Sequence, residues 1–203
     1  MLEALDHPVP ILQGLGVRIA ENVAFYIYNV FVIAYATRIL GFSSAGVLRA
    51  VWIAAVCQFF AMLIGGRLSD AVGRKPIMMV AAIGLALWAP AFFALAAISA
   101  NRGSLALLAV AICVAASLHG LLAGPEAAWI AELFPTRYRS AGGSLAFQGS
   151  SILAGGPAPL IATALMAGGR ETTGVTIYLI MCALISVLAL LSGPETKGLP
   201  ADA

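Results

Sequence analysis

Two charged side chains and an amide share one face of the first long apolar segment. Arg18 and Glu21 are three residues apart and Asn22 follows Arg18 by four, so a helix places all three on the same side. Charged residues are costly inside hydrocarbon and are functional candidates wherever they occur there. Arg18 would attract a substrate carboxylate, and Glu21 would trade a proton as Arg18 engages the substrate. The alternative is a static ion pair that holds this helix to a neighbour.

A histidine and a carboxylate lie two turns apart in the fourth apolar segment. His119 and Glu126 are separated by seven residues and therefore point the same way on a helix. Because histidine titrates near neutral pH, the two could pass a proton along that face. In the alternative readings, His119 is a structural hydrogen-bond donor, and Glu126 is solvated or paired with Arg137 or Arg139.

Uncharged polar residues would complete an otherwise apolar cavity. Tyr26 and Asn29 lie roughly on the face of Asn22, and Gln58 at mid-depth of the second segment is a plausible partner. For each alone, hydrogen bonding between helices is the alternative role. The predicted substrate and proton path comprises Arg18, Glu21, Asn22, Tyr26, Asn29, Gln58, His119 and Glu126.

The elements that must position these residues are long apolar helices. The chain has 203 residues, of which 62% are hydrophobic and 10% charged, with a mean hydropathy of +1.00; soluble domains are roughly 45–50% apolar and about 25% charged. Segments near the ~20 residues needed to cross a bilayer lie at 11–36, 46–65, 76–98, 105–133, 141–167 and 175–191. The fifth is interrupted at Gly155-Gly156-Pro157. We expect an all-α membrane protein with six transmembrane helices: an N-terminal segment (1–10), a bundle (11–191) and a tail (192–203).

Charge and motif content exclude several classes of function. A net charge of +2 gives no reason to expect a nucleic-acid partner. The chain has no G-x-x-x-x-G-K-[ST], H-E-x-x-H or G-x-S-x-G motif, so we expect neither ATP hydrolysis nor another enzymatic activity, and no metal or cofactor. Basic residues are densest at 67–75 and 137–139. The positive-inside rule therefore places these loops and both termini in the cytoplasm, for a multi-pass protein of the plasma (inner) membrane.

The loop between the second and third segments carries a recognisable motif. Residues 66–76 read GRLSDAVGRKP. Its glycines allow neighbouring helices to approach closely and the chain to reverse direction tightly. Its aspartate can cap the following turn or pair with a basic side chain, and its two adjacent basic residues can anchor the loop at the cytoplasmic face. These residues are Gly66, Asp70, Gly73, Arg74 and Lys75. The motif closely resembles the loop signature of the major facilitator superfamily, G-x-x-x-D-R-x-G-R-[KR].

Other segments carry the same resemblance. ELFPTRYRSAG at 132–142 is similar to the E-x-x-P…R segment before the eleventh helix of such transporters, and PETKG at 194–198 closes the last helix. Residues 18–26, 131–137 and 155–165 resemble the metabolite:proton symporter branch, which carries organic acids and zwitterions such as shikimate, citrate, 2-oxoglutarate and proline betaine. One position departs: Ala71 stands where the family has arginine, which removes one expected ionic contact.

The resemblance covers essentially the whole chain and implies one half-bundle of a major facilitator fold, its seventh to twelfth helices. In that family, charged residues at the cytoplasmic edge form a network that holds the cytoplasmic side closed when the transporter faces outward. The corresponding residues here would be Asp70, Arg74, Glu132 and Arg139. Gly66, Gly73, Lys75 and Arg137 complete this gate motif.

We therefore expect a secondary transporter, or half of one, that lies in membrane lipid and couples protons to a small organic acid or zwitterionic metabolite. The alternative is a truncated partner that does not transport and needs a missing N-terminal half. A missing half or a second copy would be the protein partner.

Overall fold

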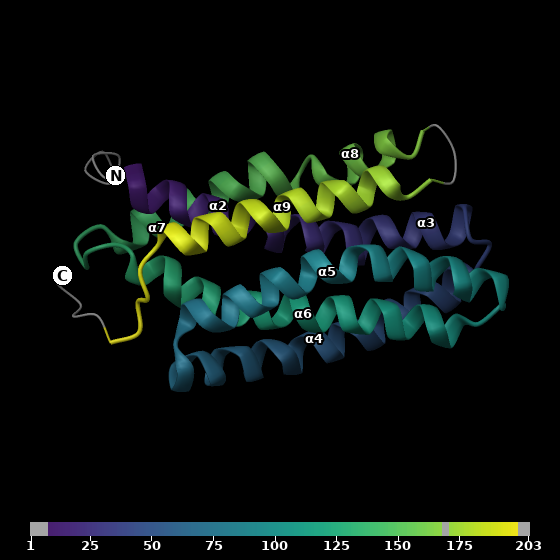
Figure 1. Cartoon of the computed structure of the whole chain (residues 1–203), viewed down its shortest axis with the longest axis horizontal. Helices are drawn as coiled ribbons and strands as arrows, with labels where there is room; N and C mark the ends of the chain where they lie inside the picture. The colour runs from purple at the N-terminus through teal and green to yellow at the C-terminus, as the bar shows by residue number, and fades with distance from the viewer. Residues whose placement is uncertain (1–7, 168–170, 199–203) are drawn as a thin grey trace.

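Long helices lie lengthwise against one another in the computed structural model, which describes residues 8–167 and 171–198 (Figure 1). The first crossing consists of α2 (Pro8–Tyr26), the π-helix η1 (Ile27–Phe31) and α3 (Val32–Arg38). Three uninterrupted helices follow: α4 (Ser44–Val72), α5 (Arg74–Asn101) and α6 (Leu105–Glu132). The chain then forms α7 (Arg139–Ser150), the π-helix η2 (Ser151–Gly155), α8 (Ala158–Leu165) and α9 (Thr173–Ser192). Residues 1–7 of the expected N-terminal segment and 199–203 of the expected tail lie outside the described residues.

Five continuous helical stretches in the described part are long and apolar enough to cross a membrane: Pro8–Arg38, Ser44–Val72, Arg74–Asn101, Leu105–Glu132 and Thr173–Ser192. The remaining expected crossing, 141–167, is built from α7, η2 and α8 and is broken after Gly155, as the sequence predicts. Pro157 has no backbone N–H to donate to a helix, so the ladder restarts at Ala158.

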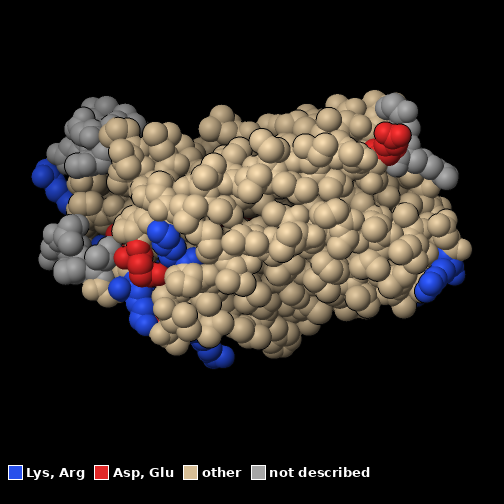
Figure 2. All heavy atoms as spheres, viewed as in Figure 1, with Lys and Arg blue, Asp and Glu red and all other residues tan. Residues whose placement is uncertain are grey.

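Charge is distributed along the bundle as expected for a membrane protein. On the face seen in Figure 2, Lys, Arg, Asp and Glu side chains gather at the two ends, and the surface between them carries none. The start of α2 and the end of α9 lie at one end (Figure 1), where the Gln13 side-chain amide donates to the Ser192 carbonyl at 2.9 Å.

Two glycines bring α4 and α6 into backbone contact, the most extensive helix contact in the described part. A Cβ on Gly120 would lie 2.5 Å from the Gln58 carbonyl oxygen, and one on Gly124 would overlap the Met62 carbonyl oxygen. Such spacing of small residues is typical of helices that pack closely in membranes. The contact fixes the position of the α6 face that carries His119.

On the other side of the bundle, α2 packs against α9 and α7. The Ser186 hydroxyl of α9 accepts from Ala20 N at 2.9 Å and donates to Gly16 O at 2.8 Å. Small residues of the broken crossing recur every fourth position and are all buried: Gly142, Ala146, Ser150, Ala154, Ala158 and Ala162. Together these contacts hold α2 between α6, α7 and α9, which places its polar face inside the bundle.

Candidate functional site

A cluster of four ionisable side chains connects α2 and α6 inside the bundle. Arg18 donates through Nη1 to Glu126 Oε2 at 2.7 Å, and its Nη2 lies 3.0 Å from Glu21 Oε2. His119 Nε2 lies 3.2 Å from Glu21 Oε1. We call Arg18, Glu21, His119 and Glu126 the central cluster.

The central cluster is shielded from its surroundings. The side chains of Arg18 and Glu126 are 10% and 1% exposed, that of His119 is 3% exposed, and that of Glu21 is 13% exposed. The Arg18 guanidinium carbon lies 3.9 Å from the centre of the Phe147 ring on α7, a cation–π contact. Glu21 is therefore the carboxylate most open to exchange with the outside.

The charges of the central cluster do not balance without a proton. One arginine faces two carboxylates, so with a neutral histidine the cluster carries one net negative charge. An uncompensated charge is expensive in a buried, apolar site, and binding of one proton removes it. Several buried polar atoms find no hydrogen-bond partner among the described residues: Arg18 Nε, Tyr28 Oη, His119 Nδ1 and Glu126 Oε1. The cluster can therefore hold a proton and still has unused hydrogen-bonding capacity.

The structure adds a neighbour to one expected residue and corrects an alternative for another. His119 and Glu126 share a face of α6, and His119 also contacts Glu21; the transfer of a proton between His119 and Glu126 stays a prediction. Glu126 is neither solvated nor paired with Arg137 or Arg139, because its face of α6 turns toward α2 and meets Arg18. The long Arg18 side chain bridges the two helices.

Of the uncharged candidates, Asn22 lies beside the cluster and links α2 to the broken crossing. Its side-chain amide donates to Arg18 O at 3.1 Å and to Ser150 Oγ at 3.2 Å, and its Oδ1 accepts from Ser151 Oγ at 3.4 Å. The Tyr26 ring lies next to Gly155, where an added Cβ would approach within 2.9 Å of Tyr26 Cε2. Both residues therefore face η2.

Asn29 and Gln58 are not brought to the cluster. Asn29 lies in η1 and donates to the carbonyl of Phe25 in its own helix at 3.1 Å. Gln58 lies on α4, whose main contact is α6, and in the described part its side chain makes no hydrogen bond. Because α4 packs mainly on α6, Gln58 does not reach the polar face of α2 through a hydrogen bond in the described part, and its place in the substrate path stays a prediction.

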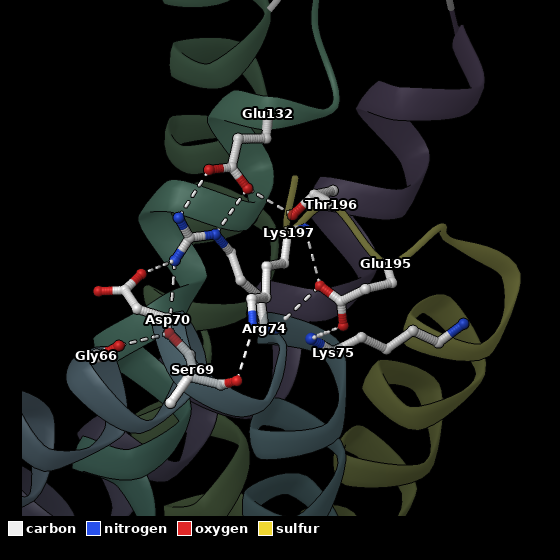
Figure 3. A network of polar contacts seen from close by, with 10 residues as sticks. Gly66, Ser69, Asp70, Arg74, Lys75, Glu132, Glu195, Thr196 and Lys197 are labelled. Atoms are coloured by element: carbon white, nitrogen blue, oxygen red, sulfur yellow. Dashed lines mark hydrogen bonds and ion pairs between the residues drawn. The ribbon is translucent and has the colours of Figure 1, made fainter. Parts of the chain in front are cut away.

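The gate motif gathers at one end of the bundle around Arg74 (Figure 3). Arg74 makes a bidentate pair with Glu132, with Nε to Oε2 at 2.7 Å and Nη2 to Oε1 at 2.8 Å. Its Nη1 donates to Asp70 Oδ1 at 2.9 Å. Bidentate pairs of this kind are strong and geometrically specific. The pair joins the start of α5 to the end of α6.

The segment after α9 completes this network, with Glu195 at its centre. The Glu195 carboxylate accepts from the backbone N–H groups of Arg74 and Lys75, each at 3.0 Å. Partial burial would raise the pKa of Glu195, but backbone N–H donors, those of Lys197, Arg74, Lys75 and Thr196, outweigh it and hold that pKa below its usual value. Glu195 therefore binds the turn between α4 and α5 as an anion.

Three further contacts tie the same segment to the gate motif. Thr196 Oγ1 donates to Glu132 Oε2 at 2.6 Å, and Lys75 Nζ donates to Gly193 O at 2.7 Å. Lys197 Nζ donates to Ala71 O at 2.6 Å, so a lysine reaches the backbone at the position where the family signature has arginine. We call Asp70, Arg74, Glu132, Glu195 and Thr196 the end network.

The remaining members of the gate motif shape the loops around the end network. Gly73 has φ +126°, which disfavours any other residue, and a Cβ there would lie 2.7 Å from Glu195 Oε2. Gly66 O accepts from Ser69 Oγ at 2.7 Å. Arg139 Nε donates to Phe134 O at 3.1 Å, and Arg137 lies in the same connection between α6 and α7.

A comparison with known families decides what this architecture is. Residues 10–203 match the profile of a family described as "Sugar (and other) transporter". The chain belongs to this sugar transporter family of the major facilitator superfamily. Its all-α crossings form half of a major facilitator fold, as expected, and the family consists of transporters, not enzymes.

The chain is similar to curated proteins that are named as metabolite transporters or symporters. It is 31% identical to a putative metabolite transport protein of Haemophilus influenzae, over 94% of this chain and 45% of the relative. It is 26% identical to a citrate-proton symporter of Klebsiella pneumoniae, over 88% and 40%. It is 30% identical to the ectoine/proline transporter ProP of Corynebacterium glutamicum, over 96% and 38%. The chain spans less than half the length of these relatives.

Several residues of the two sites were not predicted from the sequence. The PETKG segment was predicted only to close the last helix. Its Glu-Thr-Lys run lies at the same end of the bundle as the gate motif, and this is the signal that it could contact the charged residues of that motif. Phe147 and Ser151 gave no signal, because ordinary residues acquire a role here only through the packing of α7 and η2 on α2.

Proposed function

We propose that this chain takes part in proton-coupled symport of a small organic acid or zwitterionic metabolite across a cell membrane. The observation that carries the proposal is the central cluster, in which one buried arginine is shared by two carboxylates and a histidine contacts one of them. The names of two relatives, a citrate-proton symporter and an ectoine/proline transporter, agree with this class of substrate.

The geometry supports competition for Arg18 as the coupling step. When Glu21 is ionised, both carboxylates occupy the guanidinium. Protonation of Glu21, with His119 as its hydrogen-bonding neighbour, weakens its hold on Nη2. The Nη2 group is then able to bind a substrate carboxylate, while Glu126 continues to hold and orient Nη1. Asn22 and Tyr26 would line the same space.

The end network serves as the gate of the transporter. Its pairs connect α4, α5, α6 and the segment after α9, so they stabilise one conformation of that end. Breaking them would shift the population of that conformation without removing a substrate contact. The dense basic residues at this end favour the cytoplasmic side of the plasma membrane, with both chain ends on that side.

The partner of this half-bundle is part of the proposal. Major facilitator proteins bind substrate near the midplane between two six-helix units, so the second unit here would be an N-terminal half or a second copy. The competing proposal is that this chain does not transport without such a half. The chain covers less than half of the length of its relatives, which is the reason to test this second proposal directly.

The test is uptake of labelled citrate, proline and proline betaine into vesicles that contain the chain. The chain is assayed alone and with an N-terminal half from a full-length relative, each with and without a protonophore. We expect uptake that the protonophore abolishes and that Arg18→Ala removes. Arg49→Ala is the matched control, because Arg49 is exposed on α4 and belongs to neither site.

Uptake by the chain alone would show that no added N-terminal half is needed. Uptake only in the presence of the added N-terminal half would show that this chain depends on such a half for transport. Protonophore-insensitive uptake, or uptake unaffected by Arg18→Ala, would contradict the proposed coupling.

A further inference from the structure

Two aromatic rings lie beside the central cluster, on the face of α2 that carries Arg18 and Glu21. Phe25 follows Glu21 by four residues, which places it one turn along the same face, and its ring centre lies 5.6 Å from that of His119. Tyr26 comes next, with its ring centre 5.6 Å from that of Phe25 and the two ring planes at 89°. We call Phe25 and Tyr26 the aromatic corner.

The aromatic corner is open where the central cluster is shielded. Phe25 is 39% exposed, whereas His119, which its ring contacts, is buried. Tyr26 is half-buried and lies beside Gly155 of η2. Among the charged residues of the central cluster, Glu21 is the most exposed and lies nearest to Phe25 along α2. A ligand that reaches Glu21 from outside the bundle therefore meets the Phe25 ring.

The charge of the central cluster distinguishes the two proposed kinds of substrate. With one proton on Glu21 and a neutral His119, Arg18 balances Glu126 and the cluster is neutral. A zwitterion has no net charge and keeps that balance. An organic acid without a cationic group would add an uncompensated negative charge to a shielded site, which is costly. The cluster therefore favours a ligand that brings its own positive charge.

The positive group of such a ligand would lie against the aromatic corner. A substrate carboxylate that replaces Glu21 at Arg18 Nη2 lies at the level of Glu21 on α2. Phe25 is one turn further, about 6 Å along a helix, a length that a small amino-acid derivative spans. The faces of aromatic rings attract cations, and aromatic side chains are a common means of binding quaternary ammonium groups.

The chemistry of the rings also indicates how the nitrogen is substituted. A primary ammonium group has three N–H donors and needs oxygen acceptors for them. The Phe25 ring offers no such acceptor, whereas it can contact the methyl groups of a quaternary ammonium and attract its charge. The aromatic corner therefore suits an N-methylated nitrogen better than a free amine.

We propose that the aromatic corner is the binding subsite for the quaternary ammonium group of a zwitterionic substrate, with Arg18 as the subsite for its carboxylate. The substrate class of the central cluster is then a betaine, an N-methylated amino acid, and not a citrate-like anion. The inference rests on the proposed substrate site at Arg18, but its test requires no transport.

The test compares two ligands of the same shape that differ by one charge. Glycine betaine carries a trimethylammonium group, and its carbon isostere, the anion of tert-butylacetic acid, carries a tert-butyl group in the same place. Binding of each to the full chain in detergent is measured by isothermal titration calorimetry. The tert-butyl group is the more hydrophobic, so a site that recognised only shape and apolar surface would prefer the isostere.

We expect the chain to bind glycine betaine at least about fivefold more tightly than the carbon isostere. Phe25→Leu should reduce that preference about threefold, because the aromatic face is lost, whereas Phe25→Tyr should retain it. Phe59→Leu is the matched control: Phe59 is an exposed ring on α4 that packs on Phe60 of the same helix, and its loss should leave the preference unchanged.

Several outcomes would overturn the proposal. They are equal binding of the two ligands, tighter binding of the carbon isostere, a preference that Phe25→Leu leaves unchanged, and no binding of either ligand to the folded chain. The last counts because every group of the proposed subsites belongs to this chain.

Failure of this inference is distinguishable from failure of the proposed transport. A preference for betaine that depends on Phe25, in a chain that takes up no substrate, would reject only the transport. Proton-coupled uptake of citrate by a chain that does not prefer betaine would reject only the betaine subsite.

Discussion

At the scale of single residues, Arg18 is the group on which the central cluster depends. It is the one cation among the described residues in contact with Glu21 and Glu126, and both of those carboxylates are largely shielded. Removing one partner of a buried ion pair leaves the other charge without compensation, which is commonly more damaging than removing both.

We expect Arg18→Met to lower the free energy of unfolding by about 3–5 kcal/mol, because Glu126 is left buried beside no cation. The double variant Arg18→Met with Glu126→Gln should recover part of that loss. Unfolding of the four proteins of this cycle in detergent, followed by circular dichroism, measures the coupling. Additive losses would show that the two side chains do not stabilise each other.

Glu195 gives a pH dependence whose sign follows from its depressed pKa. Its ordinary pKa is about 4.3, and the folded value is lower. Its contribution is therefore fully present above the ordinary pKa and is lost as pH falls through the folded pKa. Glu195→Gln should lower stability near neutral pH by at most about 1 kcal/mol, since the side chain is largely exposed and screened by solvent.

The measurement is the melting temperature of wild type and Glu195→Gln across pH 3 to 8, a range that spans the ordinary pKa of the carboxyl group. The difference should shrink as the pH approaches the lower limit. Glu171→Gln, an exposed carboxylate at the start of the α9 region, should follow wild type throughout. A difference between wild type and Glu195→Gln that is constant with pH would rule out the carboxylate as its origin.

At the scale of elements, α4 and α6 depend on glycine at their contact. A Cβ on Gly124 would overlap a backbone carbonyl, which cannot move aside as a side chain can. We expect Gly124→Leu to cost about 1–3 kcal/mol, as overpacking does elsewhere, and to separate α4 from α6. Thermal unfolding in detergent measures this.

Gly143→Ala is the matched control for that prediction. No atom lies within 4 Å of an added Cβ at Gly143, which is also in a helix. Alanine is favoured over glycine in helix interiors by roughly 0.5–1 kcal/mol, so the control should be neutral or slightly stabilising. Equal losses in both variants would mean that close approach at Gly124 has no special importance.

The elements also show what the sequence could and could not predict. Apolar length predicts the crossings, and Gly155-Gly156-Pro157 predicts the break, because both are local properties. The π-helices η1 and η2 were not predicted, since i→i+5 bonding leaves no simple sequence pattern. The pairing of Arg18 with Glu126 spans 108 positions and depends on how α2 and α6 pack. Periodicity places each residue on a face, but it does not say which helix that face meets.

At the scale of the whole molecule, the last turns of α6 connect the two sites. Glu126 holds Arg18 in the central cluster, and Glu132 holds Arg74 in the end network. The two carboxylates are six residues apart, about 9 Å along a helix. Between them, Trp129 donates from its indole N–H to Pro194 O at 3.0 Å. A shift of this part of α6 would therefore affect both sites, a physical route for coupling that needs direct measurement.

The contacts of the end network allow a prediction of what happens when the Glu132 carboxylate is removed. Glu132→Gln removes the bidentate partner of Arg74 and weakens the Thr196 contact. Hydrogen bonds to charged groups contribute about 1.5–3 kcal/mol each, and about 1.4 kcal/mol changes a population tenfold. The closed end should therefore open at least about tenfold more often.

Ser69→Cys is the reporter for this opening, because Ser69 is fully buried beneath the end network. We expect a small neutral thiol reagent to react with it at least about tenfold faster when Glu132→Gln is present. Asp70→Asn is the comparison: the Asp70 side chain is 69% exposed and, among the described residues, bonds only to Arg74, so its loss should have a smaller effect. If Glu132→Gln leaves the labelling rate unchanged, the bidentate pair does not hold this end closed, and the gate must depend on the backbone contacts of Glu195.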